Sequence, residues 1–263
     1  MRRVCAAIML ALLAGCTTID DLAPTATSAK VMMKSPRFGD SKPQKWGFAA
    51  APTNYAVHGT DVSKYQRNVN WDTAQAAGIS FAFVKATEGA DRVDGQFETH
   101  WGATKASGVP RAAYHFYYFC RTAEEQAKWY IDNVPKEPGA LPPVLDMEWN
   151  PDSPSCKKRP DPATVRSEMK TFLGIVERYY GKKPIIYTSI DFFEDNGLAG
   201  FKGYPFWLRS VAGHPSSRYG SHPWTFWQYT GTGIVPGIEG NADINVFNGN
   251  VSAWEKWLKA NAR

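Results

Sequence analysis

The sequence from Tyr55 onward predicts an α/β fold, namely a (β/α) barrel. Eight short segments rich in β-branched and aromatic residues indicate strands. Several of these segments are apolar at consecutive positions, which is typical of strands covered on both faces. Segments with helical periodicity separate most of them, and this alternation is that of a barrel built from β/α units.

The expected strands and helices follow one another along the chain. The strand segments are YAVHGTDVS (55–63), ISFAFVKAT (79–87), RAAYHFYYF (111–119), PPVLDME (142–148), PIIYTS (184–189), YPFWLRS (204–210), WTFWQYT (224–230) and ADINVF (242–247). The expected helices cover residues 71–77, 94–107, 122–133 and 162–180. For the last helix, Asp161 is a candidate N-cap, Pro162 fits the first helical position and Gly181 fits the stop.

The closing part of the barrel is expected to be irregular or antiparallel. Only loops rich in Gly and Pro separate the last three strand segments, so little room is left there for helices. An open, doubly wound sheet is the competing architecture, but no glycine fingerprint for a dinucleotide occurs in the sequence. The final segment, VSAWEKWLKANAR, predicts a short amphipathic helix that packs back on the barrel.

The N-terminal residues predict export. Residues 1–15 are typical of a signal peptide, because Arg2 and Arg3 precede a short apolar stretch that ends in small residues. The segment LLAGC resembles the lipobox of bacterial lipoproteins, in which the Cys, here Cys16, carries the lipid. Residues 16–54 predict a disordered tether, and residues 55–263 the folded domain. We expect a lipoprotein anchored in the inner or outer membrane and facing the periplasm; an ordinary cleaved signal peptide is the alternative.

Two of the four cysteines, Cys120 and Cys156, fall in the expected domain. In an oxidising compartment they predict a disulfide, and two separate buried thiols are the alternative. Neither CxxC nor HExxH occurs, so no metal site or cofactor is expected. The net charge of +5 is too mild to indicate a nucleic-acid partner, although it is compatible with an anionic wall or membrane. We expect a monomer.

Two carboxylates end an otherwise buried segment, LPPVLDMEWN. Residues i and i+2 of a strand point to the same face, so Asp146 and Glu148 project together, with their backbones about 6.6 Å apart. Both lie where the strand ends, which is where barrel enzymes carry their chemistry. A single acid at such a place is often only a cap or a surface charge, but burying two without a function is costly.

Two further acids, Asp61 and Asp243, occur at or near the ends of other expected strands. Four carboxylates would then converge at one mouth of the barrel. Like charges close together in an aromatic cleft raise the pKa of at least one carboxyl, and a general acid requires this. The sequence therefore predicts a catalytic site here.

Taken in order, several segments resemble glycoside hydrolase family 25, the bacterial and phage muramidases that include the Chalaropsis-type lysozymes. The matching segments are GTDVSKYQ, FAFVKATEG, AYHFYYF, PVLDMEWN, PIIYTS, FWQYTGTG and GNADINVFNG. The resemblance implies a flattened, irregular barrel. It also implies hydrolysis of the β-1,4 bond between N-acetylmuramic acid and N-acetylglucosamine in peptidoglycan.

The resemblance also implies roles for the acids. Glu148 would protonate the leaving oxygen and later activate water. Asp146 would orient the substrate's own 2-acetamido group, which acts as the nucleophile in such a mechanism. Asp61 and Asp243 would position the sugar and tune the charge of this pair.

Other site residues are carried over from the same motifs. Five are expected to bind substrate, with Trp227 and Gln228 together facing the sugar from one strand end: Lys85, Tyr114, Tyr187, Trp227 and Gln228. For the aromatic residues, packing in the core is the competing interpretation. His115, between two aromatic residues on an expected strand, is interpreted as a core residue.

One feature lies outside these motifs. Cys120 and Cys156 follow two neighbouring strands, and a bond between them would clasp two loops and stiffen the rim of the cleft.

Two other functions are alternatives. One is a peptidoglycan-binding protein without catalysis. The other is a hydrolase of another N-acetylated glycan such as chitin, although the DxxDxDxE pattern of family 18 chitinases is absent.

Overall fold

The computed structural model describes residues 36–262. The expected signal peptide, Cys16 and the first part of the expected tether lie outside the described residues. Within the described part, every helix is too short or too polar to cross a bilayer.

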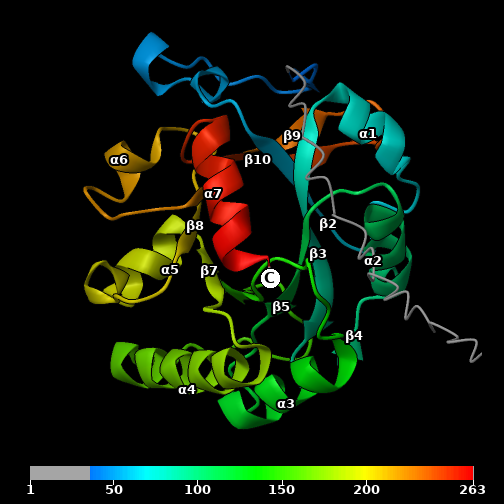
Figure 1. The fold of residues 1–263 in the computed structure, drawn as a ribbon. Coiled ribbons are helices and arrows are strands. Elements are labelled where there is room, and N and C mark those ends of the chain that lie inside the picture. Colours follow the sequence, from blue (N-terminus) through cyan, green and yellow to red (C-terminus); the bar gives the residue numbers. More distant parts are fainter. Residues whose placement is uncertain (1–35, 263) are drawn as a thin grey trace, which may run out of the picture. The chain divides into compact units, whose positions relative to one another are not determined.

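A closed barrel of eight strands forms the centre of the domain (Figure 1). The strands, in chain order, are β2 (His58–Val62), β3 (Ile79–Glu88), β5 (Arg111–Phe116), β6 (Val144–Met147), β7 (Ile185–Thr188), β8 (Phe206–Arg209), β9 (Phe226–Ile234) and β10 (Ala242–Phe247). Neighbours from β2 through β9 are parallel, whereas β10 runs antiparallel to both β9 and β2 and closes the ring. The expected barrel with an antiparallel closing part is therefore confirmed. Two short strands, β1 (Gly39–Asp40) and β4 (Arg92–Val93), pair with β9 and β3 at the margins.

Helices cover the outside of this ring (Figure 1). They are α1 (Trp71–Ala77), α2 (Phe97–Ala106), α3 (Ala123–Asn133), α4 (Pro162–Tyr180), α5 (Ile190–Asp195), α6 (Pro215–Arg218) and α7 (Val251–Asn261), with short 3-10 turns η1 (Phe48–Ala50), η2 (Pro52–Asn54) and η3 (Leu198–Gly200). The caps expected for α4 are present: the Asp161 carboxylate accepts hydrogen bonds from two backbone N–H groups, and Gly181 ends the helix with a positive φ of 70°.

Alternation along the strands divides the core into two layers. On β3, Phe81 and Phe83 belong to the cluster inside the barrel, whereas Ala82 and Val84 pack against the outer helices. Gly59 on β2 has no side chain because the Phe81 ring fills its place: a Cβ there would lie 2.4 Å from the ring. Inward-facing positions near the strand ends therefore reach the mouth of the barrel.

The C-terminal helix α7 closes the end of the barrel at which the parallel strands begin. In Figure 1 it crosses in front of the ring of strands. Its Trp254 is fully buried and packs on Phe81, Phe226 and Phe247. The expected packing of this helix on the barrel is confirmed, and the opposite end of the barrel is left as the mouth.

The folded part begins before Tyr55. Residues Gly39 and Asp40 pair with β9, and Trp46 packs edge-on against Trp227 at 5.3 Å between ring centroids. Part of the range 16–54, which was expected to be a disordered tether, therefore contacts the barrel through residues 39–40 and Trp46. Composition gave no sign of this, because the contacts depend on partners nearly 200 positions further along the chain.

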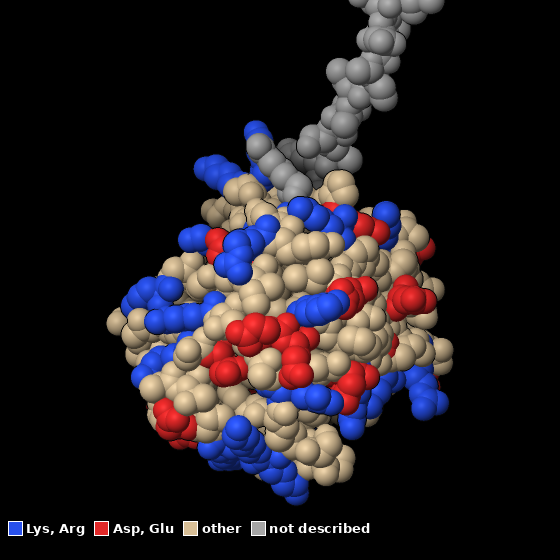
Figure 2. Space-filling view, turned by 90° about the horizontal axis from the view of Figure 1, so that it is seen from below, with Lys and Arg blue, Asp and Glu red and all other residues tan. Residues whose placement is uncertain are grey.

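Charge is distributed unevenly over the side of the domain that carries α3 and α4. Figure 2 shows a group of Asp and Glu side chains near the centre of this side, with Lys and Arg spread around it. The positive net charge is therefore not concentrated in one continuous basic surface on this side of the described residues.

Candidate active site

The mouth of the barrel brings all four predicted acids to one end. Asp61 lies near the end of β2 and Asp243 near the beginning of β10, and the two residues are register partners. This pairing is possible because β10 is antiparallel, so its first residues meet the last residues of β2. The hydroxyl of Thr60 also donates to the carbonyl oxygen of Asp243 at 2.7 Å, which fixes this junction.

Asp61 is held by two side-chain amides. Nε2 of Gln228 donates to its carboxylate at 3.0 Å, and Nδ2 of Asn245 donates at 2.8 Å. Each amide is oriented in turn: the Tyr187 hydroxyl donates to Oε1 of Gln228 at 2.9 Å, and Nε1 of Trp207 donates to Oδ1 of Asn245 at 2.7 Å. Asp61 therefore has a fixed position, held by two amides that are themselves oriented by side chains of two further strands.

Asp146 and Glu148 come from β6 and the residue just after it. Met147 between them is fully buried among the outer helices, so alternation turns both acids toward the mouth. Asp146 is only 6% exposed, and its Oδ1 has no hydrogen-bond partner in the described residues. A buried carboxylate oxygen without a partner is costly and is often found where a ligand supplies the missing donor.

Burial raises the pKa of all four carboxyls. For Asp146 burial and then the charge of Glu148 raise the pKa well above its usual value. Burial raises the pKa of Glu148 to about 7, with Asp191 and Asp61 adding to the effect and Arg209 and Lys85 opposing it.

In Asp61 and Asp243, neighbouring groups reduce the rise in pKa that burial causes, but to different extents. Burial raises the pKa of Asp61 to about 6, because the hydrogen bonds from Asn245 and Gln228 partly stabilise its charge. Burial and the charge of Asp61 raise the pKa of Asp243 to about 8. The cluster therefore holds protons at neutral pH, as a general acid must.

Lys85 and Tyr114, which were expected to bind substrate, also lie at the mouth of the barrel. Lys85 on β3 forms an ion pair of 2.7 Å with Glu88, and its Nζ lies 4.8 Å from the centre of the Phe116 ring. Burial first, and then the charges of Asp61 and Asp146, raise the pKa of Tyr114. The Tyr114 hydroxyl is therefore neutral and near both carboxylates.

Trp227 is not at the mouth, and this prediction was wrong. It follows Phe226 and precedes Gln228, both of which face into the barrel, so alternation turns Trp227 outward. It is fully buried beneath Trp46, and its Nε1 donates to the carbonyl oxygen of Ser210. Two consecutive strand residues cannot both face the sugar, and core packing explains this one.

His115 has the core role that the sequence indicated. It is fully buried, and its two ring nitrogens lie 2.8 Å from the Thr87 hydroxyl and 3.1 Å from Oε1 of Gln126. It also stacks on Phe172 of α4. Its ring faces the outer helices and not the carboxylates.

Sequence reasoning missed two residues of the mouth, Asn245 and Arg209. Asn245 lies two positions after Asp243 and therefore on the same face, which was a usable signal. Arg209 lies two positions after Trp207, which faces into the barrel, at the end of an expected strand. In both cases the period of two along a strand predicts the face of the strand on which the residue lies.

The disulfide between Cys120 and Cys156 is present, with 5.8 Å between the Cα atoms. It joins the segment after β5 to the loop after β6, which directly follows Glu148. A second link runs alongside: Nδ2 of Asn150 donates to the Tyr118 hydroxyl at 3.1 Å, and that hydroxyl donates to Glu88. The predicted clasp across two adjacent loops is confirmed.

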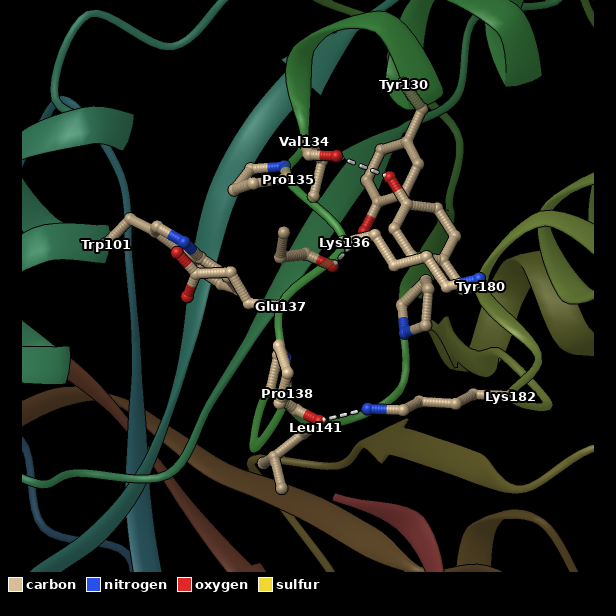
Figure 3. A pocket seen from close by; sticks show the side chains of 13 residues that line it. Trp101, Tyr130, Val134, Pro135, Lys136, Glu137, Pro138, Leu141, Tyr180 and Lys182 are labelled. Atoms are coloured by element: carbon tan, nitrogen blue, oxygen red, sulfur yellow. Dashed lines mark hydrogen bonds between the residues drawn. The ribbon is translucent and has the colours of Figure 1, made fainter. Parts of the chain in front are cut away.

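A separate hollow of about 280 Å³ lies at the other end of the barrel (Figure 3). Its walls are mostly apolar and include Trp101, Tyr130 and Tyr180, while Nζ of Lys182 donates to the carbonyl oxygen of Ala140 at its edge. The lining comes from the connections that precede β6 and β7, whereas the four acids lie where strands such as β6 end. This hollow is therefore distinct from the site of the acids.

Within residues 36–262, no group of three or more His, Cys, Asp or Glu side chains has the arrangement of a metal site. A family model described as glycosyl hydrolases family 25 matches residues 60–238, a range that includes Asp61 and β6 with Asp146. The chain belongs to this family.

Curated proteins and a solved structure resemble the chain over most of its length. The chain is 32% identical to lysozyme M1 of Streptomyces globisporus over 210 residues, which covers 74% of this chain and 69% of that protein. It is 29% identical to the N,O-diacetylmuramidase of Chalaropsis sp over 212 residues, covering 76% of this chain and 98% of that one. A family 25 glycosyl hydrolase from Bacillus anthracis superposes with a TM-score of 0.70 at 33% identity, covering 83% of this chain and 99% of that chain.

Proposed function

We propose that this family 25 enzyme is a lysozyme that cleaves the β-1,4 bond between N-acetylmuramic acid and N-acetylglucosamine in peptidoglycan. The observation that carries the proposal is the gathering of four buried or half-buried carboxyls at one mouth of the barrel, in a chain of this family. The relatives named lysozyme M1 and N,O-diacetylmuramidase support the same activity and the same substrate.

Glu148 acts as the general acid. With a pKa of about 7, it carries its proton at neutral pH and can transfer it to the glycosidic oxygen as the bond breaks. The resulting carboxylate then removes a proton from the incoming water. The positive charges of Arg209 and Lys85 lower the pKa of Glu148, so they make it easier for Glu148 to give up its proton.

Asp146 serves the substrate's 2-acetamido group. Its unpartnered Oδ1 can accept a hydrogen bond from the acetamido N–H, which turns the acetamido oxygen toward the anomeric carbon. Attack by that oxygen gives a positively charged oxazolinium ring, and this charge lowers the cost of the buried Asp146 carboxylate at the step that needs it. Gln228 and Asn245 hold Asp61 in a fixed position, so that its negative charge stays close to the reacting sugar.

The test is the Glu148→Gln variant, assayed for release of reducing ends from purified peptidoglycan. Because the amide cannot donate a proton as an acid, we expect the rate to fall by about 10²- to 10⁴-fold. Glu255→Gln, an exposed position on α7, is the matched control and should keep full activity. Full activity in Glu148→Gln would refute the assignment.

The same products separate this function from the alternatives. Mass spectrometry should find the new reducing end on muramic acid. Binding to peptidoglycan without release of fragments by the wild-type protein would favour a non-catalytic binding protein. Faster cleavage of chitin than of peptidoglycan would favour a hydrolase of another N-acetylated glycan.

We further propose that the enzyme is an exported lipoprotein held in a membrane through Cys16 and facing the periplasm. The support is the sequence LLAGC at the end of a signal-like stretch. Mass spectrometry of the mature N-terminus should find an acylated Cys16, and an unmodified N-terminus at another residue would contradict the proposal.

A further inference from the structure

Arg209 is the last residue of β8 and faces the mouth of the barrel. Trp207, two residues earlier, packs inside the barrel on Phe83 and Tyr187, whereas Leu208 between them packs among the outer residues. Arg209 is also the register partner of Gln228, whose amide binds Asp61. Alternation and register therefore both place the Arg209 side chain beside the acids.

The backbone that carries this arginine is fixed. The Tyr219 hydroxyl donates to the carbonyl oxygen of Arg209 at 2.6 Å, and the next residue, Ser210, donates its N–H to the carbonyl oxygen of Gln228 at 2.9 Å. Tyr219 is itself buried. The guanidinium thus extends from a rigid strand end and not from a mobile loop.

Two cations flank the acids, and their states differ. Lys85 is half-buried and already paired with Glu88 at 2.7 Å. Arg209 is exposed, and among the described residues no carboxylate lies within 4.0 Å of its guanidinium. Its five N–H donors are therefore free of an ion pair, while those of Lys85 are committed.

The charges in the mouth show on which side Arg209 lies. Its positive charge lowers the pKa of Glu148, Asp61 and Asp243, whereas Lys85 acts on Asp146 and, less strongly than Arg209, on Glu148. Asp191 is a further acid on the Glu148 side, but its carboxylate accepts the Ser189 hydroxyl at 2.5 Å and lies beyond ion-pair distance of Arg209. Arg209 therefore lies at the mouth of the barrel, on the side of the general acid.

The glycan itself offers this guanidinium no anion, because both sugars are N-acetylated and the lactyl group of muramic acid is joined to the peptide stem as an amide. The free carboxylates of peptidoglycan are on the peptide stems. A planar guanidinium binds a carboxylate through two parallel hydrogen bonds. We propose that Arg209 binds a free carboxylate of the peptide stem and makes the enzyme prefer stems with free carboxylates over amidated stems.

This inference rests on the proposed lysozyme function and is tested with a matched pair of substrates. Soluble glycan oligomers with peptide stems are first acetylated at their amino groups. One half keeps its carboxylates, and the other half is converted to primary amides. The kcat/KM for release of reducing ends is then measured on both, and the ratio of the two values is the readout.

The wild-type enzyme should prefer the carboxylate substrate by about three- to tenfold, the size expected for one exposed, charge-assisted pair. Arg209→Gln should bring the ratio to about 1, and Arg209→Lys should keep part of the preference. Arg178→Gln, an exposed position on α4, is the control and should leave the ratio unchanged. In the wild type, the preference should weaken as salt is added.

The ratio separates this role from an effect on the acids alone. Loss of the Arg209 charge raises the pKa of Glu148 for both substrates alike, so it cancels in the ratio. An equal loss of kcat/KM on both substrates in Arg209→Gln, or a wild-type ratio of 1 at low salt, would overturn the inference. A wild-type enzyme that cleaves neither substrate would instead overturn the proposed function.

Discussion

The disulfide between Cys120 and Cys156 allows a quantitative prediction of stability. It closes a segment with a sequence separation of 36 that contains α3 and β6. In the chain-entropy description, a cross-link over a loop of this length stabilises the folded state by about 4 kcal/mol at 25 °C. For a domain of this size each kcal/mol shifts Tm by roughly 2–4 °C, so removal of the bond should lower Tm by roughly 8–15 °C.

The assay is thermal unfolding of the wild type with and without reductant, together with Cys120→Ser, Cys156→Ser and the double variant. Cys120 is exposed, so reductant can reach the bond. Because each single substitution already removes the bond, all three variants should melt at nearly the same temperature. Reductant should lower the Tm of the wild type to about this value and leave the variants unchanged.

Two results would refute this reasoning. A Tm of the wild type that does not change under reductant would mean that the bond does not limit global unfolding. Single variants that differ widely from each other would mean that side-chain packing of Cys156, which is 8% exposed, is the larger effect. The link from Asn150 to Tyr118 remains in every variant, so activity well below the lowered Tm should change much less than stability.

The remaining predictions concern the general acid and the end of the barrel that α7 closes. Because burial raises the pKa of Glu148 to about 7 and its protonated form is the active one, kcat/KM should fall as pH rises through about 7; a fall already complete near pH 5 would contradict this role. Trp254→Ala empties a fully buried site beneath Phe81 and Phe226 and should cost about 3–5 kcal/mol, measured by denaturant unfolding, whereas Phe48→Ala, at a side chain that is 94% exposed, should be neutral.

Local rules predicted much of this fold. The caps of α4 at Asp161 and Gly181 depend only on residues next to them in the sequence, and both were found as expected. The joint projection of Asp146 and Glu148 follows from the period of two along a strand. To predict that the four acids meet, the ring of strands must also be closed. The alternation of strands and helices predicted this closed barrel.

Other features depended on tertiary partners. The outward orientation of Trp227 follows from the same period of two, once Gln228 is known to face inward. The pairing of β1 with β9 joins segments that are nearly 200 positions apart, and the composition of residues 39–54 does not encode it. The importance of Arg209 for the site follows only from its position relative to Glu148 and Asp243. In the sequence, a single arginine at a strand end resembles any surface charge.

The antiparallel closing strand also has a consequence for biosynthesis. Asp61 lies on β2, the first strand of the ring in chain order, whereas Asp243 and Asn245 lie on β10, the last one. The chain must therefore be synthesised through the end of β10 before the ring can close and Asp61 can acquire its second amide partner. A chain stopped short of residue 242 would carry Glu148 and Asp146 but neither a sealed barrel nor a complete set of acids, so nascent fragments should be unable to cut a glycan.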